Sequence, residues 1–241
     1  MRVGKSVKKR ILRLCLDKLE DRNIFVTRKR HPNDFMLSQR IQACLIKNSP
    51  DVLHIGAHIG QEAPFYAECD AGVIWIEANP NSIQELEENI SKFSGQKAFN
   101  LLLGKQTSSG IPFFIATNEG ASSSIFTFRD SENTGSPKMS DVLILDMFRL
   151  DDVFDSKDLE TYRHWVLDVQ GAEIEVLEGA GKLLSVARSI LVESKRYSEY
   201  KGGANWDDLL NFLKSRGFQN MWNPIENEED NILFIRNNTS I

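Results

Sequence analysis

The sequence contains little cysteine and no long apolar run. Its three cysteines, Cys15, Cys44 and Cys69, are scattered along the chain. This excludes the dense disulfide framework of a small secreted domain and the paired cysteines of a zinc site. No uninterrupted apolar stretch approaches the roughly eighteen residues that a membrane-spanning helix requires. Basic residues also interrupt the N-terminal apolar pattern, so a secretory signal is not predicted, and we expect a cytoplasmic protein with reduced thiols.

Charge is distributed unevenly along the 241 residues. The net charge is −5, but residues 1–30 hold eleven Lys or Arg against three Asp or Glu. Apolar residues in this segment recur at helical spacing and predict an amphipathic helix over about 5–20. Such a helix either packs on the domain with its lysines in solvent or contacts an acidic partner or a membrane surface peripherally. We predict no nucleic-acid partner.

From residue 51 onward, strand and helix patterns alternate. The order strand 52–55, helix 61–69, strand 73–76 and helix 81–93 is typical of an α/β domain with a parallel sheet and helical crossovers. A further helix over 34–48 precedes it, and 129–140 reads as a polar linker. The remaining expected elements are strands at 97–103, 111–116, 124–128, 142–145, 164–167, 189–192, 218–222 and 231–235, and helices at 150–154, 172–178 and 206–215.

The first strand runs directly into a glycine-bracketed turn, V-L-H-I-G-A-H-I-G-Q-E over 52–62. Gly56 and Gly60 permit close approach of a ligand to the backbone, and Glu77 ends the next strand where it can accept hydrogen bonds from a ribose. The turn lacks the middle glycine of G-x-G-x-x-G, which NAD enzymes use at the pyrophosphate. An adenosine cofactor without a pyrophosphate is therefore favoured. The alternatives are a simple tight turn and a solvent-facing strand end.

Four segments in order resemble the FkbM family of S-adenosylmethionine-dependent methyltransferases over about 51–236. They are the glycine turn, W-I-E-A-N-P at 75–80, L-D-V-Q-G-A-E-I-E-V-L-E-G-A at 167–180 and L-V-E-S-K-R-Y-S-E-Y at 191–200. The resemblance implies a class I methyltransferase (Rossmann-like) fold, with a seven-stranded, mostly parallel sheet between helices and an antiparallel last strand. It also implies S-adenosylmethionine as cofactor and O-methylation of a sugar, glycan or secondary metabolite. We expect a basic helical extension at 1–50 and the methyltransferase domain at 51–241.

The resemblance also implies cofactor contacts. Gly56, Ala57 and Gly60 would line the methionine portion, and Glu77 would hold the ribose hydroxyls. Four further residues are candidates, and three of them also have a structural interpretation. His54 occupies a position where the family often has an acid. His58 either contacts the methionine carboxylate or is an exposed turn residue. Glu62 either contacts the cofactor or caps a helix, and Asn79 either contacts the adenosine or makes a turn.

Two carboxylates are the candidate catalytic residues. Asp168 and Glu193 each end an apolar strand, which places them at the ligand-binding edge of an open parallel sheet. One can act as general base toward an acceptor hydroxyl, Asp168 first, while the other orients it. Glu173 is interpreted as a helix-terminus charge. We predict no metal, since no tight cluster of three ligands appears and the four histidines lack zinc-like spacing; His164 is expected in the core.

Polar turns beside these acids are candidates for acceptor binding. Gln170 and Gly171 follow Asp168, and the loop 118–123 offers an amide and two hydroxyls at the same edge or is simply a hairpin connection. Tyr197 and Tyr200 stack on a sugar or only pack. The predicted acceptor-binding residues are Gln170, Gly171, Asn118, Ser122 and Ser123.

Two other functions remain open from the sequence. An NAD-linked or nucleotide-sugar-linked Rossmann enzyme explains the glycine turn and Glu77 but not the later segments. A non-catalytic binding module would act through the basic N-terminal helix. The favoured partner is a small-molecule or glycan acceptor.

Overall fold

The computed structural model describes residues 45–46, 51–129, 137–221 and 229–237. The expected helix at 5–20 lies outside these residues, as do Cys15 and Cys44. Of the expected helix at 34–48, Leu45 and Ile46 are described, and both are helical and buried. The basic helical extension at 1–50 therefore stays a prediction. In the described part of the chain, no helix combines the length and apolar character needed to cross a membrane.

A seven-stranded sheet forms the centre of the molecule, in the order β3-β2-β1-β7-β8-β10-β9. β10 is antiparallel to both its neighbours, and the other pairs are parallel. This confirms the class I methyltransferase fold that the resemblance implies. The strands are β1 (Asp51–Ile55), β2 (Val73–Glu77), β3 (Gln96–Asn100), β7 (Tyr162–Leu167), β8 (Ser189–Lys195), β9 (Phe218–Asn220) and β10 (Glu229–Arg236).

The central strands are those with the most continuous apolar sequence. Every residue of β2 is buried, and so are four of the five residues of β1. Strands of a parallel sheet are covered on both faces, so they read as apolar runs rather than as an alternation. The carboxyl end of each buried strand is therefore the first position along it from which a polar side chain can reach solvent or a ligand.

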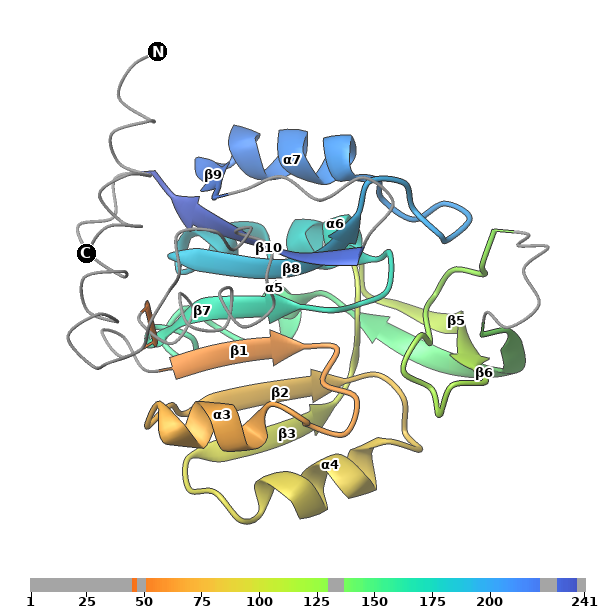
Figure 1. The fold of residues 1–241 in the computed structure, drawn as a ribbon, viewed down its shortest axis with the longest axis horizontal. Helices are drawn as coiled ribbons and strands as arrows, with labels where there is room; N and C mark the ends of the chain where they lie inside the picture. The colour runs from red at the N-terminus through yellow and green to blue at the C-terminus, as the bar shows by residue number, and fades with distance from the viewer. Residues whose placement is uncertain (1–44, 47–50, 130–136, 222–228, 238–241) are drawn as a thin grey trace, which may run out of the picture.

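The helices lie on both faces of the sheet because the strand order reverses at β1. The chain proceeds from β1 to β2 and β3 on one side and from β7 to β8 on the other, and right-handed crossovers then place the two sets of helices on opposite faces. Figure 1 shows α3 in front of the sheet and α6 behind it. The helices are α3 (Ala63–Glu68), α4 (Ile83–Ile90), α5 (Leu150–Val153), α6 (Glu173–Gly179) and α7 (Trp206–Ser215), with a 3-10 helix at Gly181–Ser185.

This reversal of strand order also determines at which edge of the sheet a ligand can bind. Loops from β1 and β7 leave in opposite directions, so a crevice opens at the carboxyl ends of these neighbouring strands. Figure 1 shows a second, small sheet beyond the carboxyl ends of β1 and β2.

The small sheet was not predicted from the sequence. It has the order β4-β6-β5, with β4 (Leu102–Leu103), β5 (Ser108–Ala116) and β6 (Met139–Phe148). The prediction of a single strand at 97–103 is wrong. The chain leaves the main sheet at Leu101, and Leu102 and Leu103 pair with β6 instead. The strand expected at 124–128 is also wrong, since only isolated bridges form at Ser124 and Phe128. The linker expected at 129–140 is wrong at its end, where Met139 begins β6.

Candidate functional site

The Glu77 carboxylate joins the turns that follow β1 and β2. Its Oε2 accepts the backbone N–H of His58 at 2.7 Å, and its Oε1 accepts that of Asn79 at 2.6 Å. The side chain is buried, and this burial raises the pKa of Glu77 above its ordinary value, although the two N–H groups act in the opposite direction. The carboxylate is thus fixed at the mouth of both turns, with lone pairs left for a ligand.

Gly56 is required by the protein's own backbone geometry. Its φ is +85°, and a Cβ built on it would lie 1.8 Å from the carbonyl oxygen of Asp168. The end of β1 therefore approaches the end of β7 more closely than any side chain permits. This contact holds the glycine turn beside the Asp168 carboxylate.

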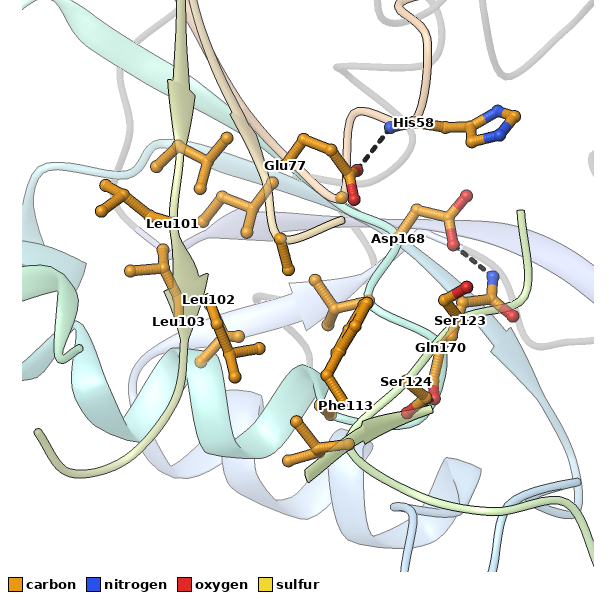
Figure 2. A pocket seen from close by; sticks show the side chains of 18 of the residues that line it. His58, Glu77, Leu101, Leu102, Leu103, Phe113, Ser123, Ser124, Asp168 and Gln170 are labelled. Atoms are coloured by element: carbon orange, nitrogen blue, oxygen red, sulfur yellow. Dashed lines mark hydrogen bonds between the residues drawn. The ribbon is translucent and has the colours of Figure 1, made fainter. Parts of the chain in front are cut away.

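His58 is held in an uncommon backbone conformation. Its φ is +46°, which lets its N–H face Glu77 while the imidazole points away from the cleft, as Figure 2 shows. Its Nε2 lies 3.1 Å from the carbonyl oxygen of Glu119, and its Nδ1 lies 2.9 Å from the amide nitrogen of Gln61. His58 therefore contributes its backbone to the cleft, and its ring ties the turn to the loop at 117–123.

The other predicted residues of the first turn lie behind the cleft surface. The Ala57 N–H bonds to the Ile76 carbonyl at 3.1 Å, and a Cβ on Gly60 would lie 2.6 Å from the Leu86 side chain. Glu62 is the residue before α3, and burial raises its pKa. These positions shape the turn and are not among the residues that line the cleft.

His54 and Asn79 are also absent from the cleft lining. The His54 ring stacks on Trp75 with centroids 4.8 Å apart, and its Nδ1 lies 3.1 Å from the Tyr66 hydroxyl. Burial lowers the pKa of His54 to about 3, so the ring is neutral. The Asn79 side-chain oxygen accepts the N–H of Asn81 at 3.0 Å, which is turn chemistry. His54 therefore belongs to the core in this structure, and the side chain of Asn79 to the second turn.

The two turns open into a cleft of about 610 Å³. Figure 2 shows Glu77 and Asp168 on one side and leucines with Phe113 on the other. This combination of an apolar wall and a few fixed polar groups is the usual form of a small-molecule site. The lining residues are Ile55, Gly56, His58, Ile76, Glu77, Ala78, Leu101, Leu102, Leu103, Phe113, Gly120, Ala121, Ser123, Ser124, Ile125, Asp168, Val169, Gln170, Ala172 and Val176.

Gln170 links the two predicted catalytic carboxylates. Its Nε2 donates to Asp168 Oδ1 at 2.5 Å and to Glu193 Oε2 at 2.8 Å. Its Oε1 accepts the hydrogen of the Tyr200 hydroxyl at 2.5 Å. The backbone is held as well, since Ser124 Oγ donates to the Gln170 carbonyl at 2.8 Å. The structure therefore brings Asp168 and Glu193 together from adjacent strands through one amide.

The environment of Asp168 suits proton transfer near neutral pH. Burial raises the pKa of Asp168 to about 6, while hydrogen bonds from Glu193 and Gln170 act in the opposite direction and the charges of Glu173 and Glu62 add to the rise. A carboxylate with a pKa close to the working pH is an effective general base.

A second cavity of about 370 Å³ adjoins the cleft, and Gln170 lines both. Its wall carries Glu173 and Glu193, and at its rim Lys195 Nζ lies 2.6 Å from Glu199 Oε2. Gly171, at φ +96°, lines this cavity beside Tyr200. The second cavity is therefore polar and predominantly acidic.

The loop at 117–123 approaches the site from the small sheet. Ser123 lines the cleft, whereas the side chains of Asn118 and Ser122 hydrogen-bond to each other at 2.9 Å in an exposed position. The Ser122 carbonyl lies 3.1 Å from the Tyr200 hydroxyl. Of the three predicted loop residues, Ser123 alone is among those lining the cleft in the described part of the chain.

Sequence reasoning missed the apolar wall and the role of Tyr200. Leu101, Leu102 and Leu103 follow the end of β3, but their position depends on the change of sheet at Leu101. Phe113 comes from the small sheet, which had no sequence signal as a separate unit. Among the described residues, no three His, Cys, Asp or Glu side chains gather as a metal-binding group; the absence of a metal stays a prediction.

Comparison with protein families shows a match between residues 54–219 and the model of the methyltransferase FkbM domain. Similar solved structures include a magnesium protoporphyrin IX methyltransferase from Synechocystis PCC 6803 with bound SAM, at 12% identity over 85% of this chain and 85% of that chain, with a TM-score of 0.43. They also include an rRNA methylase from Streptococcus thermophilus, at 11% identity over 87% of this chain and 99% of that chain, with a TM-score of 0.47. No curated protein sequence matches significantly.

Proposed function

Because this chain belongs to the FkbM family of S-adenosylmethionine-dependent methyltransferases, we propose that it methylates a hydroxyl group of a sugar, glycan or secondary metabolite. The single observation that carries the proposal is the cleft in which the fixed carboxylate of Glu77 and the general-base candidate Asp168 lie at the ends of β2 and β7, the two strands on either side of β1. Membership of this enzyme family excludes the hypothesis of a non-catalytic binding module. It also accounts for the glycine turn and Glu77 without an NAD-linked or nucleotide-sugar-linked enzyme.

The residues present fit the methyl donor. Glu77 would accept hydrogen bonds from the ribose hydroxyls, and the leucines after β3 with Phe113 would cover the adenine. Gly56 and the His58 backbone would face the methionine portion. When bound, S-adenosylmethionine supplies a methyl group on a positively charged sulfur.

Asp168 is proposed to accept the proton of the acceptor hydroxyl. Its carboxylate lines the cleft, and because its pKa is raised to about 6, it can bind a proton near neutral pH. Glu193, joined to it through Gln170, would orient the acceptor. Asp168 and Glu193 would thereby hold the acceptor oxygen toward the methyl group that a bound S-adenosylmethionine would supply, and positioning of this kind can accelerate a transfer strongly.

The second cavity is proposed to hold the body of the acceptor. Hydroxyl groups can donate to the Glu173 and Glu193 carboxyls, whereas phosphate or carboxylate groups would be repelled there. This supports an acceptor rich in neutral hydroxyls, such as an uncharged saccharide. The cytoplasmic location and a contact through residues 1–30 with a membrane or acidic partner stay predictions.

Calorimetry with S-adenosylhomocysteine tests the cofactor site. We expect saturable binding by the wild type and a loss of roughly a hundredfold in Glu77→Ala, because two charge-assisted ribose contacts disappear. Glu87→Ala, in the exposed part of α4, is the matched control and should bind as the wild type does. Preferential binding of NAD would reject the proposal.

An acceptor screen with labelled methyl donor tests the chemistry. In Asp168→Asn, transfer to any acceptor found should fall by roughly a hundredfold or more, while S-adenosylhomocysteine affinity stays close to that of the wild type. Full transfer by Asp168→Asn would exclude Asp168 as the base.

A further inference from the structure

The loop at 117–123 follows β5 and has a fixed internal structure. The Gly120 N–H bonds to the Ala116 carbonyl at 3.1 Å, and the side chains of Asn118 and Ser122 hydrogen-bond to each other at 2.9 Å. A compact loop whose polar groups find partners within the loop itself keeps its shape without support from its surroundings. The loop can therefore move relative to the main sheet as one unit.

This loop supplies one wall of the cleft. Gly120, Ala121 and Ser123 line the same cleft as Glu77 and Asp168. The two acids stand at strand ends of the main sheet, whereas the loop is carried by the small sheet. A ligand in the cleft would therefore lie between two separate parts of the fold, and movement of the loop would open the cleft. Loops in such positions commonly act as lids.

His58 and Asn79 hold the loop where it meets the main sheet. His58 Nε2 lies 3.1 Å from the Glu119 carbonyl oxygen, and because a carbonyl only accepts, Nε2 is the donor. The Gln61 amide donates to His58 Nδ1 at 2.9 Å, which fixes the ring in this orientation. Gly120 packs against Asn79, since a Cβ on Gly120 would lie 2.7 Å from Asn79 Nδ2. The two side chains thus contact the loop, and the His58 ring points away from the cleft (Figure 2).

Both partners of the bond between His58 and Glu119 have an uncommon backbone conformation. The φ angle is +46° at His58 and +59° at Glu119, in the left-handed region that residues other than glycine seldom adopt. Such conformations persist where the surrounding structure imposes them, and they are frequent at sites that clamp a ligand. This strain indicates that the contact between the turn and the loop has a function beyond packing.

The contact at the other end of the loop is weaker. The Tyr200 hydroxyl has one hydrogen and two acceptors, Gln170 Oε1 at 2.5 Å and the Ser122 carbonyl oxygen at 3.1 Å. The nearer acceptor, Gln170, takes the hydrogen. The His58 ring therefore provides the side-chain hydrogen bond that fixes the loop.

We propose that the loop at 117–123 is a lid over S-adenosylmethionine and that His58 is a positioning residue that keeps this lid closed. The inference rests on the proposed function, in which the cofactor occupies the cleft. The lid opens when the His58 ring releases the Glu119 carbonyl, and the cofactor then enters or leaves. The ring acts through the loop and touches no reacting atom.

The lid has a kinetic signature that separates it from a direct contact with the cofactor. The bond between His58 and Glu119 joins two protein groups, so it stabilises the closed lid by the same amount before and after the cofactor binds. An interaction of equal strength in both states cancels from the affinity. Loss of the bond should therefore raise the association and dissociation rates together, because entry and exit both require opening. Loss of a direct contact raises the dissociation rate alone.

Surface plasmon resonance with the full chain and S-adenosylhomocysteine measures both rates. Asn accepts the left-handed backbone of position 58, but its amide is too short to reach Glu119. In His58→Asn both rates should rise about fivefold, the value of one hydrogen bond, while the dissociation constant stays within about twofold of the wild type. His58→Gln, whose Nε2 is as far along the side chain as the ring Nε2, should bring both rates back toward the wild type. Asp70→Asn, at an exposed left-handed residue after α3, is the control and should change neither rate.

The possible results are distinguishable. Unchanged rates in His58→Asn overturn the proposal, and equal rates in His58→Asn and His58→Gln overturn the role of the ring nitrogen. A faster dissociation with a matching loss of affinity also overturns the lid, because it makes His58 a direct contact of the cofactor. A wild type that does not bind S-adenosylhomocysteine rejects the proposed function and this inference with it, whereas binding with unchanged rates rejects the inference alone.

Discussion

Glu173 is a buried carboxyl group whose ionisation should lower the stability of the fold. Its side chain is 6% exposed, and its Oε1 accepts the Gly171 N–H at 3.1 Å. Burial raises the pKa of Glu173 from 4.5 to about 7, with a further rise from the charges of Glu193 and Glu175. Glu173→Gln keeps the oxygen that accepts the Gly171 N–H and removes the charge.

The sign and size of the effect follow from these pKa values. Because the folded pKa lies above the unfolded one, the folded chain holds the extra proton between pH 4.5 and about 7, and the free energy of unfolding falls as pH rises through this range. At about 1.4 kcal/mol per pH unit, the loss amounts to about 3 kcal/mol in the wild type. Glu173→Gln should not show this loss.

Thermal unfolding at pH 5 and pH 8 measures the difference. The variant should unfold on the order of 10 °C above the wild type at pH 8 and close to it at pH 5. Glu178→Gln, at an exposed residue of the same helix, controls for loss of a surface charge and should follow the wild type at both values. Equal pH dependence in the wild type and Glu173→Gln would refute the reasoning.

Three other substitutions test neighbouring parts of the structure. Gly56→Ala should lower the free energy of unfolding by more than about 3 kcal/mol in urea titrations, because its Cβ meets the Asp168 carbonyl oxygen at 1.8 Å; a change below about 1 kcal/mol would contradict that contact. The wild type should lose about 2 kcal/mol more stability than His54→Phe when the pH falls from 6 to 4, as measured by acid titration. The reason is that the His54 pKa is lowered from 6.5 to about 3 in the folded state, so only the unfolded chain binds a proton at His54 in this range. Parallel titration curves for the two proteins would contradict this reasoning. Tyr200→Phe should keep S-adenosylhomocysteine affinity within about twofold but slow methyl transfer by roughly tenfold, with a shifted pH profile, because Gln170 loses its hydroxyl partner; an unchanged profile would make Tyr200 a packing residue only.

Local pattern sufficed for the segment from β1 to β2. The apolar strand, the turn at Gly56 and the acid at Glu77 all lie within residues 51–77, from the start of β1 to the end of β2. Consecutive strands joined by a short crossover usually lie side by side in a parallel sheet, which brings their carboxyl ends together. The cleft location, the neighbouring position of Asp168 and the class of fold could therefore be predicted before any contact was known.

Long-range contacts decided the rest. His54 was a cofactor candidate by position, but the neighbouring strand supplies Trp75 and α3 supplies Tyr66, and together they draw the ring into the core. Gln170 was predicted to meet the acceptor, yet its bonds to Asp168 and Glu193 depend on the pairing of β7 with β8.

The sequence by itself determined the alternation of strands and helices and the chemistry at the strand ends, because burial imposes apolar runs that stop where polar groups can reach solvent or ligand. Only the tertiary structure decided the small sheet, the leucine wall and the amide between the two acids. These depend on which distant backbone edges pair, and residue type constrains that choice only weakly.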